Sequence, residues 1–346
     1  MSNLLVDTKI ISNIKLENPN SICNFFPLSE KSEKFIKKIR QEITDIIYGK
    51  DKRIIVILGP CSIHDLNSAE EYADFVLEMR EKFNDKLLII MRTYFVKPRT
   101  TVGWKGYLYD PYLDNSNRID IGLRKIREFL CKITELEVPC SMEHLDNITP
   151  QYFDDLLCWS CIGARTVESQ IHRELASGIS TPVGFKNPIS GDINIAIQAI
   201  KSAMNSHSFL GCNKDGNISN VITSGNPDTH LVLRGSKYGP NYYKDSLQFC
   251  SELLESNNIK TQIIIDCSHG NSEKDYKKQI DVINYISKLN KSEKKSICGF
   301  MIESNLVEGK QDIKDIPLIY GKSITDSCVN LEETEKMLNI LYNLII

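Results

Sequence analysis

Residues 53–91 read RIIVILGPCSIHDLNSAEEYADFVLEMREKFNDKLLIIM, and this stretch decides the fold. The apolar runs Arg53–Leu58 and Leu87–Met91 predict buried strands, because parallel strands that are covered on both faces show no polar alternation. Between them, the range Ala69–Phe83 repeats apolar side chains at helical spacing on one face, at Tyr72, Phe75, Val76 and Met79. A strand, an amphipathic helix and a second strand in this order predict a parallel βαβ unit.

The same alternation continues along the rest of the chain. Further apolar runs predict strands at Val138–Met142, Ile162–Thr166, Pro182–Lys186, His230–Arg234, Gln262–Cys267 and Cys298–Ser304. Amphipathic helices are predicted between them at Ile121–Leu136, Ile193–Met204 and Glu273–Leu289. Eight strands with helical crossovers predict an α/β fold, a (β/α)8 TIM barrel. A doubly wound open sheet is the alternative, since it gives the same local pattern.

The chain has 346 residues, roughly a hundred more than the ~250 of a bare barrel. Part of the surplus is residues 1–50, an arm and a helix that runs from about Ser32 to Tyr48 and ends at Gly49. Another part is about 206–229, where glycines interrupt short apolar runs and predict an inserted β-hairpin. We therefore expect one catalytic barrel over residues 51–346, decorated by an N-terminal helical extension and the hairpin.

Composition excludes several classes of protein. With 41% hydrophobic and 25% charged residues the chain is globular rather than disordered. The net charge of −3 and the absence of polybasic or long apolar runs predict neither a nucleic-acid partner nor a membrane. Eleven scattered cysteines and an N-terminus without signal-peptide features favour a cytoplasmic protein with reduced thiols. Cys158 and Cys161 form a CxxC motif, which we interpret as structural rather than redox-active.

Polar side chains follow every predicted strand, where a barrel builds its active-site mouth. In chain order they are Cys61, Arg92 with Lys97 and Arg99, Glu143, Arg165, Lys186, Arg234, His269 after Asp266, and Glu303. A single strand-end cation is usually a solvated surface charge, so the prediction depends on the whole set. Cations gathered at one mouth predict phosphate or carboxylate ligands.

Four residues of this set or just beyond it can ligate a metal: Cys61, His269, Glu303 and Asp326. Mixed sulfur, nitrogen and oxygen donors suit Mn, Fe, Co or Zn. The four are far apart in the sequence, so the residues alone favour a buried cysteine and a hydrogen-bonded histidine over a metal site.

Seven segments carry motifs more specific than any generic signature: Gly59–Asp65 (GPCSIHD), Met91–Lys105 (MRTYFVKPRTTVGWK), Ile162–Gln170 (IGARTVESQ), Gly184–Asn187 (GFKN), Ile265–Asn271 (IDCSHGN), Met301–Gly309 (MIESNLVEG) and Tyr320–Asp326 (YGKSITD). Through them the chain resembles the class I, microbial type of 3-deoxy-D-arabino-heptulosonate 7-phosphate (DAHP) synthase over nearly its whole length. The resemblance implies a transferase that condenses phosphoenolpyruvate with erythrose 4-phosphate and water, releasing phosphate. This reaction opens the shikimate pathway to chorismate and the aromatic amino acids.

The resemblance also implies roles for individual residues. Cys61, His269, Glu303 and Asp326 match the ligands of a divalent metal ion, and Lys97 and His269 are candidates for proton transfer. Phosphoenolpyruvate contacts match Arg92, Lys97, Glu143, Arg165, Lys186 and Arg234, with the backbone of Ala164. Erythrose 4-phosphate contacts match Pro98, Arg99 and Thr100, and Asp326 belongs to the substrate site as well. A strand-end lysine such as Lys186 can instead form a Schiff base with a carbonyl substrate, but this family uses none.

Family members are commonly inhibited by an aromatic amino acid. The matching effector positions are Pro150, Gln151, Ser180, Phe209 and Gly211, beside a neighbour's N-terminal arm, which implies a homo-oligomer, dimer or tetramer. Glycine at 211 favours the tyrosine-sensitive branch.

The chain departs from the common family pattern in two places. Pro188 stands in the loop after GFKN where close relatives have a glycine-rich sequence, and His144 stands where relatives often have an apolar residue. A 3-deoxy-octulosonate 8-phosphate synthase and a non-catalytic sugar-phosphate-binding barrel are the alternative functions.

Overall fold

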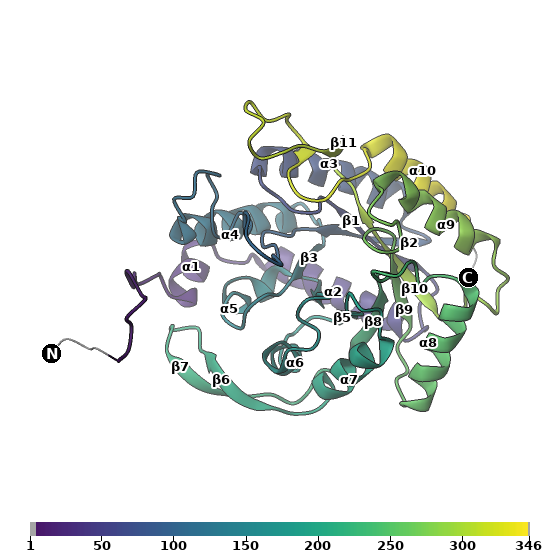
Figure 1. Cartoon of the computed structure of the whole chain (residues 1–346), viewed down its shortest axis with the longest axis horizontal. Coiled ribbons are helices and arrows are strands. Elements are labelled where there is room, and N and C mark those ends of the chain that lie inside the picture. The colour runs from purple at the N-terminus through teal and green to yellow at the C-terminus, as the bar shows by residue number, and fades with distance from the viewer. Residues whose placement is uncertain (1–4, 345–346) are drawn as a thin grey trace.

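The computed structural model describes residues 5–344. Its centre is a closed parallel barrel (Figure 1), whose strands are β1 (Ile54–Gly59), β2 (Leu87–Arg92), β3 (Cys140–Glu143), β4 (Trp159–Ile162), β5 (Val183–Lys186), β8 (Thr229–Leu233), β9 (Ile263–Asp266) and β10 (Ile297–Glu303). β1 pairs with both β2 and β10, which closes the sheet. The predicted (β/α)8 barrel is confirmed, and the open sheet is excluded.

Helices cover the outside of the barrel. They are α3 (Leu66–Phe83), α4 (Ile119–Glu135), α5 (Pro150–Phe153), α6 (Gln170–Ala176), α7 (Ile193–Ala203), α8 (Lys244–Ser256), α9 (Gln279–Lys288) and α10 (Leu331–Tyr342). The Asp65 side chain caps α3 by accepting hydrogen bonds from the backbone N–H groups of Asn67 and Ser68. No helix among residues 5–344 is long and apolar enough to cross a membrane.

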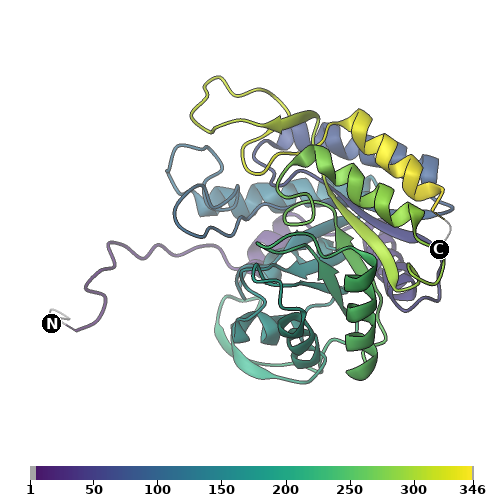
Figure 2. The same ribbon diagram turned by 45° about the vertical axis from the view of Figure 1, so that its right-hand side comes forward.

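The N-terminal extension closes one end of the barrel. It contains α1 (Pro19–Phe25) and α2 (Glu30–Ile47), and Gly49, with a φ of 71°, follows α2 as predicted. Ile36, Ile39 and Ile43 of α2 pack in one cluster with inward-facing strand residues of the barrel. Each fully buried isoleucine stabilises the fold by roughly 2 kcal/mol. Residues 5–18 form an extended arm that leaves the body of the molecule (Figure 2).

The inserted hairpin is present, with β6 (Ser208–Cys212) antiparallel to β7 (Ile218–Ile222). It lies apart from the barrel sheet, along the edge that α5 and α6 occupy (Figure 1). The structure adds a small parallel sheet that was not predicted, formed by β11 (Val307–Lys310) and β12 (Lys322–Ser323).

Two predicted elements are displaced along the chain. β4 runs from Trp159 to Ile162, whereas the predicted strand began at Ile162. The strand cannot continue beyond Ile162, because Gly163 begins a turn in which its carbonyl accepts hydrogen bonds from the backbone of Thr166 and Val167. Cys161 therefore lies within a strand, and Arg165 lies in the following loop. α9 starts at Gln279 rather than Glu273, because Glu273 and Lys274 have φ values of 53° and 65°, outside the helical region.

Candidate active site

The carboxyl ends of the barrel strands surround a cavity of about 310 Å³. Most of the predicted site residues line it, namely Lys97, Pro98, Arg99, Glu143, Ala164, Arg165, Lys186, Arg234, His269, Glu303 and Asp326. Cys61 and Arg92 are buried and do not line the cavity, although they contact residues that do. Thr100 lies beside it and accepts a hydrogen bond from Arg165 Nε at 3.1 Å. Residues at the ends of the predicted strands therefore lie together in the fold.

Potential metal ligands meet at the inner wall of this cavity. One ligand atom each from Cys61, Glu303 and Asp326 lies within 4.8 Å of the others. Asp326 reaches this place because Val329 pairs with Ser304 and Cys328 pairs with Gly309, which folds the segment after β12 over the end of β10. The structure thus brings together residues that are 265 positions apart in the chain.

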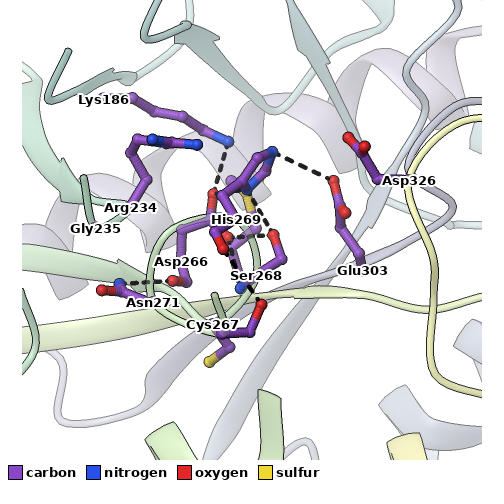
Figure 3. Close-up of polar contacts among 12 residues, drawn as sticks. Lys186, Arg234, Gly235, Asp266, Cys267, Ser268, His269, Asn271, Glu303 and Asp326 are labelled. Carbon is purple, nitrogen blue, oxygen red and sulfur yellow. Dashed lines mark hydrogen bonds and ion pairs between the residues drawn. The ribbon is translucent and has the colours of Figure 1, made fainter. Parts of the chain in front are cut away.

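His269, after β9, lies beside this group and approaches Glu303, but it is outside the set whose ligand atoms all lie within 4.8 Å of one another. Its Nδ1 lies 2.9 Å from Asp266 Oδ2 and 2.6 Å from Ser268 Oγ, and its Nε2 lies 3.7 Å from Glu303 Oε1 (Figure 3). Partners on one ring nitrogen fix the orientation of the imidazole and leave the other nitrogen facing the cavity. His269 lies in the loop after β9 and has a left-handed backbone, with a φ of 59°.

The chemistry of these donors fits a divalent transition metal. Burial, and then the charge of Glu303, raise the pKa of the Cys61 thiol to about 12. The thiol therefore keeps its proton at neutral pH unless a cation replaces that proton. Burial opposes the ionisation of Asp326, but the nearby Lys97 and His269 lower its pKa below the usual value. A thiol, two carboxylates and an imidazole match the borderline metals better than Mg²⁺ or Ca²⁺, which prefer all-oxygen sites.

Two cations contact potential metal ligands. Arg92 is 1% exposed, and its Nη2 lies 3.2 Å from Glu303 Oε1. Lys97 Nζ donates to Cys61 Sγ at 2.9 Å and also lines the cavity. Arg92 and Lys97 thus each contact a potential metal ligand directly, and Lys97 also lines the cavity.

Lys186 and Asp266 form a buried ion pair beside this group. Lys186 Nζ donates to Asp266 Oδ2 at 2.9 Å, and neither side chain is more than 5% exposed (Figure 3). Although burial opposes its ionisation, the charges of His269 and Lys186 hold the pKa of Asp266 well below its usual value. Lys186 therefore faces both a buried carboxylate and the cavity.

Two cavity-lining lysines escaped the sequence analysis. Lys274 lies in the loop after β9, which was predicted as helix, and Lys310 ends β11. Within residues 5–344, neither side chain forms an ion pair or a hydrogen bond. Lys310 follows the eighth predicted strand in a polar stretch, which marks it as a possible site residue. Its place at the cavity depends on the pairing of β11 with β12.

A second cavity, of about 330 Å³, lies among the hairpin, α5 and the end of α6. Of the predicted effector residues, Pro150, Gln151, Ser180 and Phe209 line it, whereas Gly211 does not. A Cβ atom on Gly211 would lie 2.7 Å from Val221 Cγ2 and 3.5 Å from the Phe209 ring. Gly211 therefore lies next to the cavity, where the absence of a Cβ leaves room for Val221.

Known proteins resemble this chain over nearly its whole length. Residues 26–339 match the DAHP synthetase I family. The Phe-sensitive phospho-2-dehydro-3-deoxyheptonate aldolase of Escherichia coli K12 is 47% identical, over 97% of this chain and 96% of its own. The Tyr-sensitive enzyme of the same strain is 43% identical, over 94% and 92%. The solved structure of the Francisella tularensis SCHU S4 enzyme has a TM-score of 0.95 and 48% identity, over 97% and 98%. The chain therefore belongs to the DAHP synthetase I family and is a transferase of the DAHP synthase type.

Proposed function

We propose that this enzyme is a metal-dependent DAHP synthase whose active site is the 310 Å³ cavity. The observation that carries the proposal is the convergence of the Cys61 thiol and the Glu303 and Asp326 carboxylates within 4.8 Å, at the wall of a cation-lined cavity. Together with His269 they would hold the ion. When bound there, a divalent metal supplies Lewis acidity to the aldehyde oxygen of erythrose 4-phosphate.

The cations of the cavity bind and orient the two substrates. Arg165, Lys186 and Arg234 neutralise the phosphate and carboxylate of phosphoenolpyruvate, and fixing this substrate removes part of the entropic barrier. Lys97 and His269 both line the cavity and are the candidates for proton transfer. The new bond joins C3 of phosphoenolpyruvate to the aldehyde carbon. Water adds at C2, and the C–O bond to phosphate breaks, so that one DAHP and one phosphate leave.

The test is phosphate release from phosphoenolpyruvate. We expect release to require erythrose 4-phosphate, to stop when EDTA is added and to return with excess Mn²⁺, Fe²⁺, Co²⁺ or Zn²⁺. Release that EDTA does not affect would contradict the metal-dependent reaction. Faster release with arabinose 5-phosphate would favour the eight-carbon synthase, and binding without release would favour a sugar-phosphate sensor. Borohydride trapping of substrate on Lys186 would favour the Schiff-base mechanism.

Lys310 extends the proposed sugar-phosphate site. Arg99 and Lys310 both line the active-site cavity and an adjoining one of about 440 Å³. The Arg99 guanidinium is anchored by Nε, which donates to the Trp104 carbonyl at 2.7 Å. The two cations stand where the phosphate of erythrose 4-phosphate would lie, outside the phosphoenolpyruvate group.

Lys310→Ala is therefore expected to raise KM for erythrose 4-phosphate about tenfold, because the substrate loses one charge-assisted hydrogen bond. KM for phosphoenolpyruvate should stay within about twofold, and steady-state phosphate release measures both. Lys322→Ala is the matched control, because Lys322 lies on the paired strand β12 and lines neither cavity. Equal changes in both KM values, or the same change in the control, would contradict this role.

The second cavity is the proposed effector site, and tyrosine is the proposed effector. Its lining combines the apolar Leu175, Ile179 and Val221 with the polar Gln151 and Ser180, which suits an aromatic amino acid. A Cβ at Gly211 would come within 2.7 Å of Val221, which lines the cavity, so glycine leaves Val221 room beside a bound phenol ring.

The N-terminal arm and the hairpin support a homo-oligomer, dimer or tetramer. Ile11 and Ile14 of the arm and Leu210, Ile218 and Ile222 of the hairpin are all more than 75% exposed. Apolar side chains gathered on two projecting segments favour burial against another copy. We assign residues 1–50 and the hairpin to assembly and regulation, and residues 51–346 to the catalytic barrel.

A further inference from the structure

A chain of buried hydrogen bonds crosses three neighbouring parts of the barrel wall. Thr181, just before β5, donates from Oγ1 to Ser160 Oγ at 2.8 Å, and Ser160 Oγ lies 3.0 Å from His144 Nε2. None of the three residues is more than 2% exposed. The chain thus connects β3, β4 and β5 through side chains, in addition to their backbone pairing.

One end of this chain begins at the wall of the effector cavity. Ser180 lines that cavity, and its backbone N–H donates to Asp154 Oδ2 at 3.2 Å. The next residue, Thr181, accepts at its carbonyl a hydrogen bond of 3.0 Å from Asn226 Nδ2, just after the hairpin. A shift of the cavity wall or of the hairpin base therefore carries Thr181 with it.

The other end lies beside the active site. His144 directly follows Glu143, which lines the active-site cavity, and its backbone N–H donates to the Cys161 carbonyl at 3.1 Å. The Glu143 carboxylate packs against Gly163, where Oε1 would lie only 2.0 Å from an added Cβ. Because this packing leaves so little space, a displacement of His144 moves Glu143 relative to the substrates.

Structural stabilisation alone does not explain these residues. Within residues 5–344, His144 Nδ1 is buried without a hydrogen-bond partner, and so are Asp154 Oδ1 and His172 Nε2 nearby. Buried polar groups that lack a partner are costly, and an apolar residue at 144 would avoid that cost. A partly satisfied polar network can adopt a second arrangement more easily than a fully packed apolar wall.

We propose that His144 is a positioning residue that transmits occupancy of the effector cavity to Glu143 through Ser160 and Thr181. The proposal rests on the feedback inhibition proposed above and names its route. Effector binding orders Ser180 and the hairpin, which moves Thr181, Ser160 and His144 in turn. The altered position of Glu143 then disfavours the reactive arrangement of the substrates.

The experiment measures inhibition and effector binding separately in single variants. Thr181→Val replaces the hydroxyl by a methyl group and keeps the shape of the side chain. Ser160→Ala removes the hydroxyl in the middle of the hydrogen-bond chain. Phosphate release by wild type is measured with phenylalanine, tyrosine and tryptophan, of which tyrosine should inhibit most strongly. The concentration of that amino acid giving half inhibition should rise about tenfold in each variant, within the usual range of allosteric coupling.

Three further readouts separate coupling from folding. Without effector, kcat and both KM values should stay within about twofold of wild type, and calorimetry should show that the effector still binds. Thr181→Ser, which keeps the hydroxyl, should restore inhibition, and the Ser160→Ala/Thr181→Val double variant should be no worse than either single one. Thr229→Val is the matched control, because Thr229 Oγ1 is buried on β8 without a hydrogen-bond partner among residues 5–344.

The outcomes distinguish the proposal from the function on which it rests. Inhibition unchanged in Thr181→Val and Ser160→Ala, with an inhibited wild type, would overturn the route and leave feedback inhibition intact. The same loss of inhibition in Thr229→Val would also overturn the route. A wild type that none of the three amino acids inhibits would overturn the proposed feedback control, and this inference with it.

Discussion

Replacing Cys61 by alanine is expected to lower the rate of phosphate release at least about a thousandfold. Cys61 supplies the only sulfur of the proposed ligand group, 3.4 Å from Asp326 Oδ2 and buried from solvent. Its loss removes both a proposed metal ligand and the sulfur atom that Lys97 contacts at 2.9 Å. A thousandfold in rate corresponds to about 4 kcal/mol of transition-state stabilisation, the scale of a Lewis-acid contribution.

The measurement pairs steady-state phosphate release with the metal content of the purified protein. Cys298→Ala is the matched control, since Cys298 is also a buried thiol of the barrel but donates to the Ile263 carbonyl, away from the cavity. We expect the control to retain its metal and nearly all of its activity. A Cys61→Ala enzyme that retains both would show that the three converging donors do not hold a catalytic ion.

The barrel was predictable because its signal is local. In β1 and β2 every residue is buried, so the apolar runs that fill both faces appear directly in the sequence. β4 was misplaced because Cys158–Cys161 contains the polar Ser160, whose buried hydroxyl has partners just after β3 and just before β5. α9 was extended too far because the left-handed backbone of Glu273 and Lys274 leaves no trace in hydrophobic periodicity.

The site was predictable only as far as it follows the strands. Cys61, Glu143, Lys186 and Glu303 come at strand ends, and parallel pairing alone brings strand ends together. The residues named Asp326 as a possible metal ligand but could not place it, because its position depends on the pairing of residues 304–309 with 328–329 beyond the last strand. Lys310 depends on the same long-range pairing. Arg92 was expected among the substrate contacts, and its burial against Glu303 follows from side-chain packing that strand order does not determine.

Lys186→Met is expected to cost about 3 kcal/mol of stability and to lower kcat/KM for phosphoenolpyruvate about a thousandfold or more. Removing the ammonium leaves the Asp266 carboxylate buried, with Ser268 and His269 as its remaining side-chain partners among residues 5–344. An uncompensated buried charge destabilises a protein by several kcal/mol. The same change removes a charge-assisted contact to the anionic substrate, which lies in a site partly closed to water. Urea denaturation and initial rates measure the two effects separately.

The double variant Lys186→Met/Asp266→Asn separates the structural and catalytic parts of this ion pair. Neutralising Asp266 removes the uncompensated charge, so most of the lost stability should return. Activity should not return, because the phosphoenolpyruvate site still lacks its cation and His269 loses the carboxylate beside its Nδ1. Lys294→Met is the matched control, since Lys294 is a buried lysine outside the cavity. Restored activity in the double variant would mean that Lys186 serves only to balance Asp266 and does not contact the substrate.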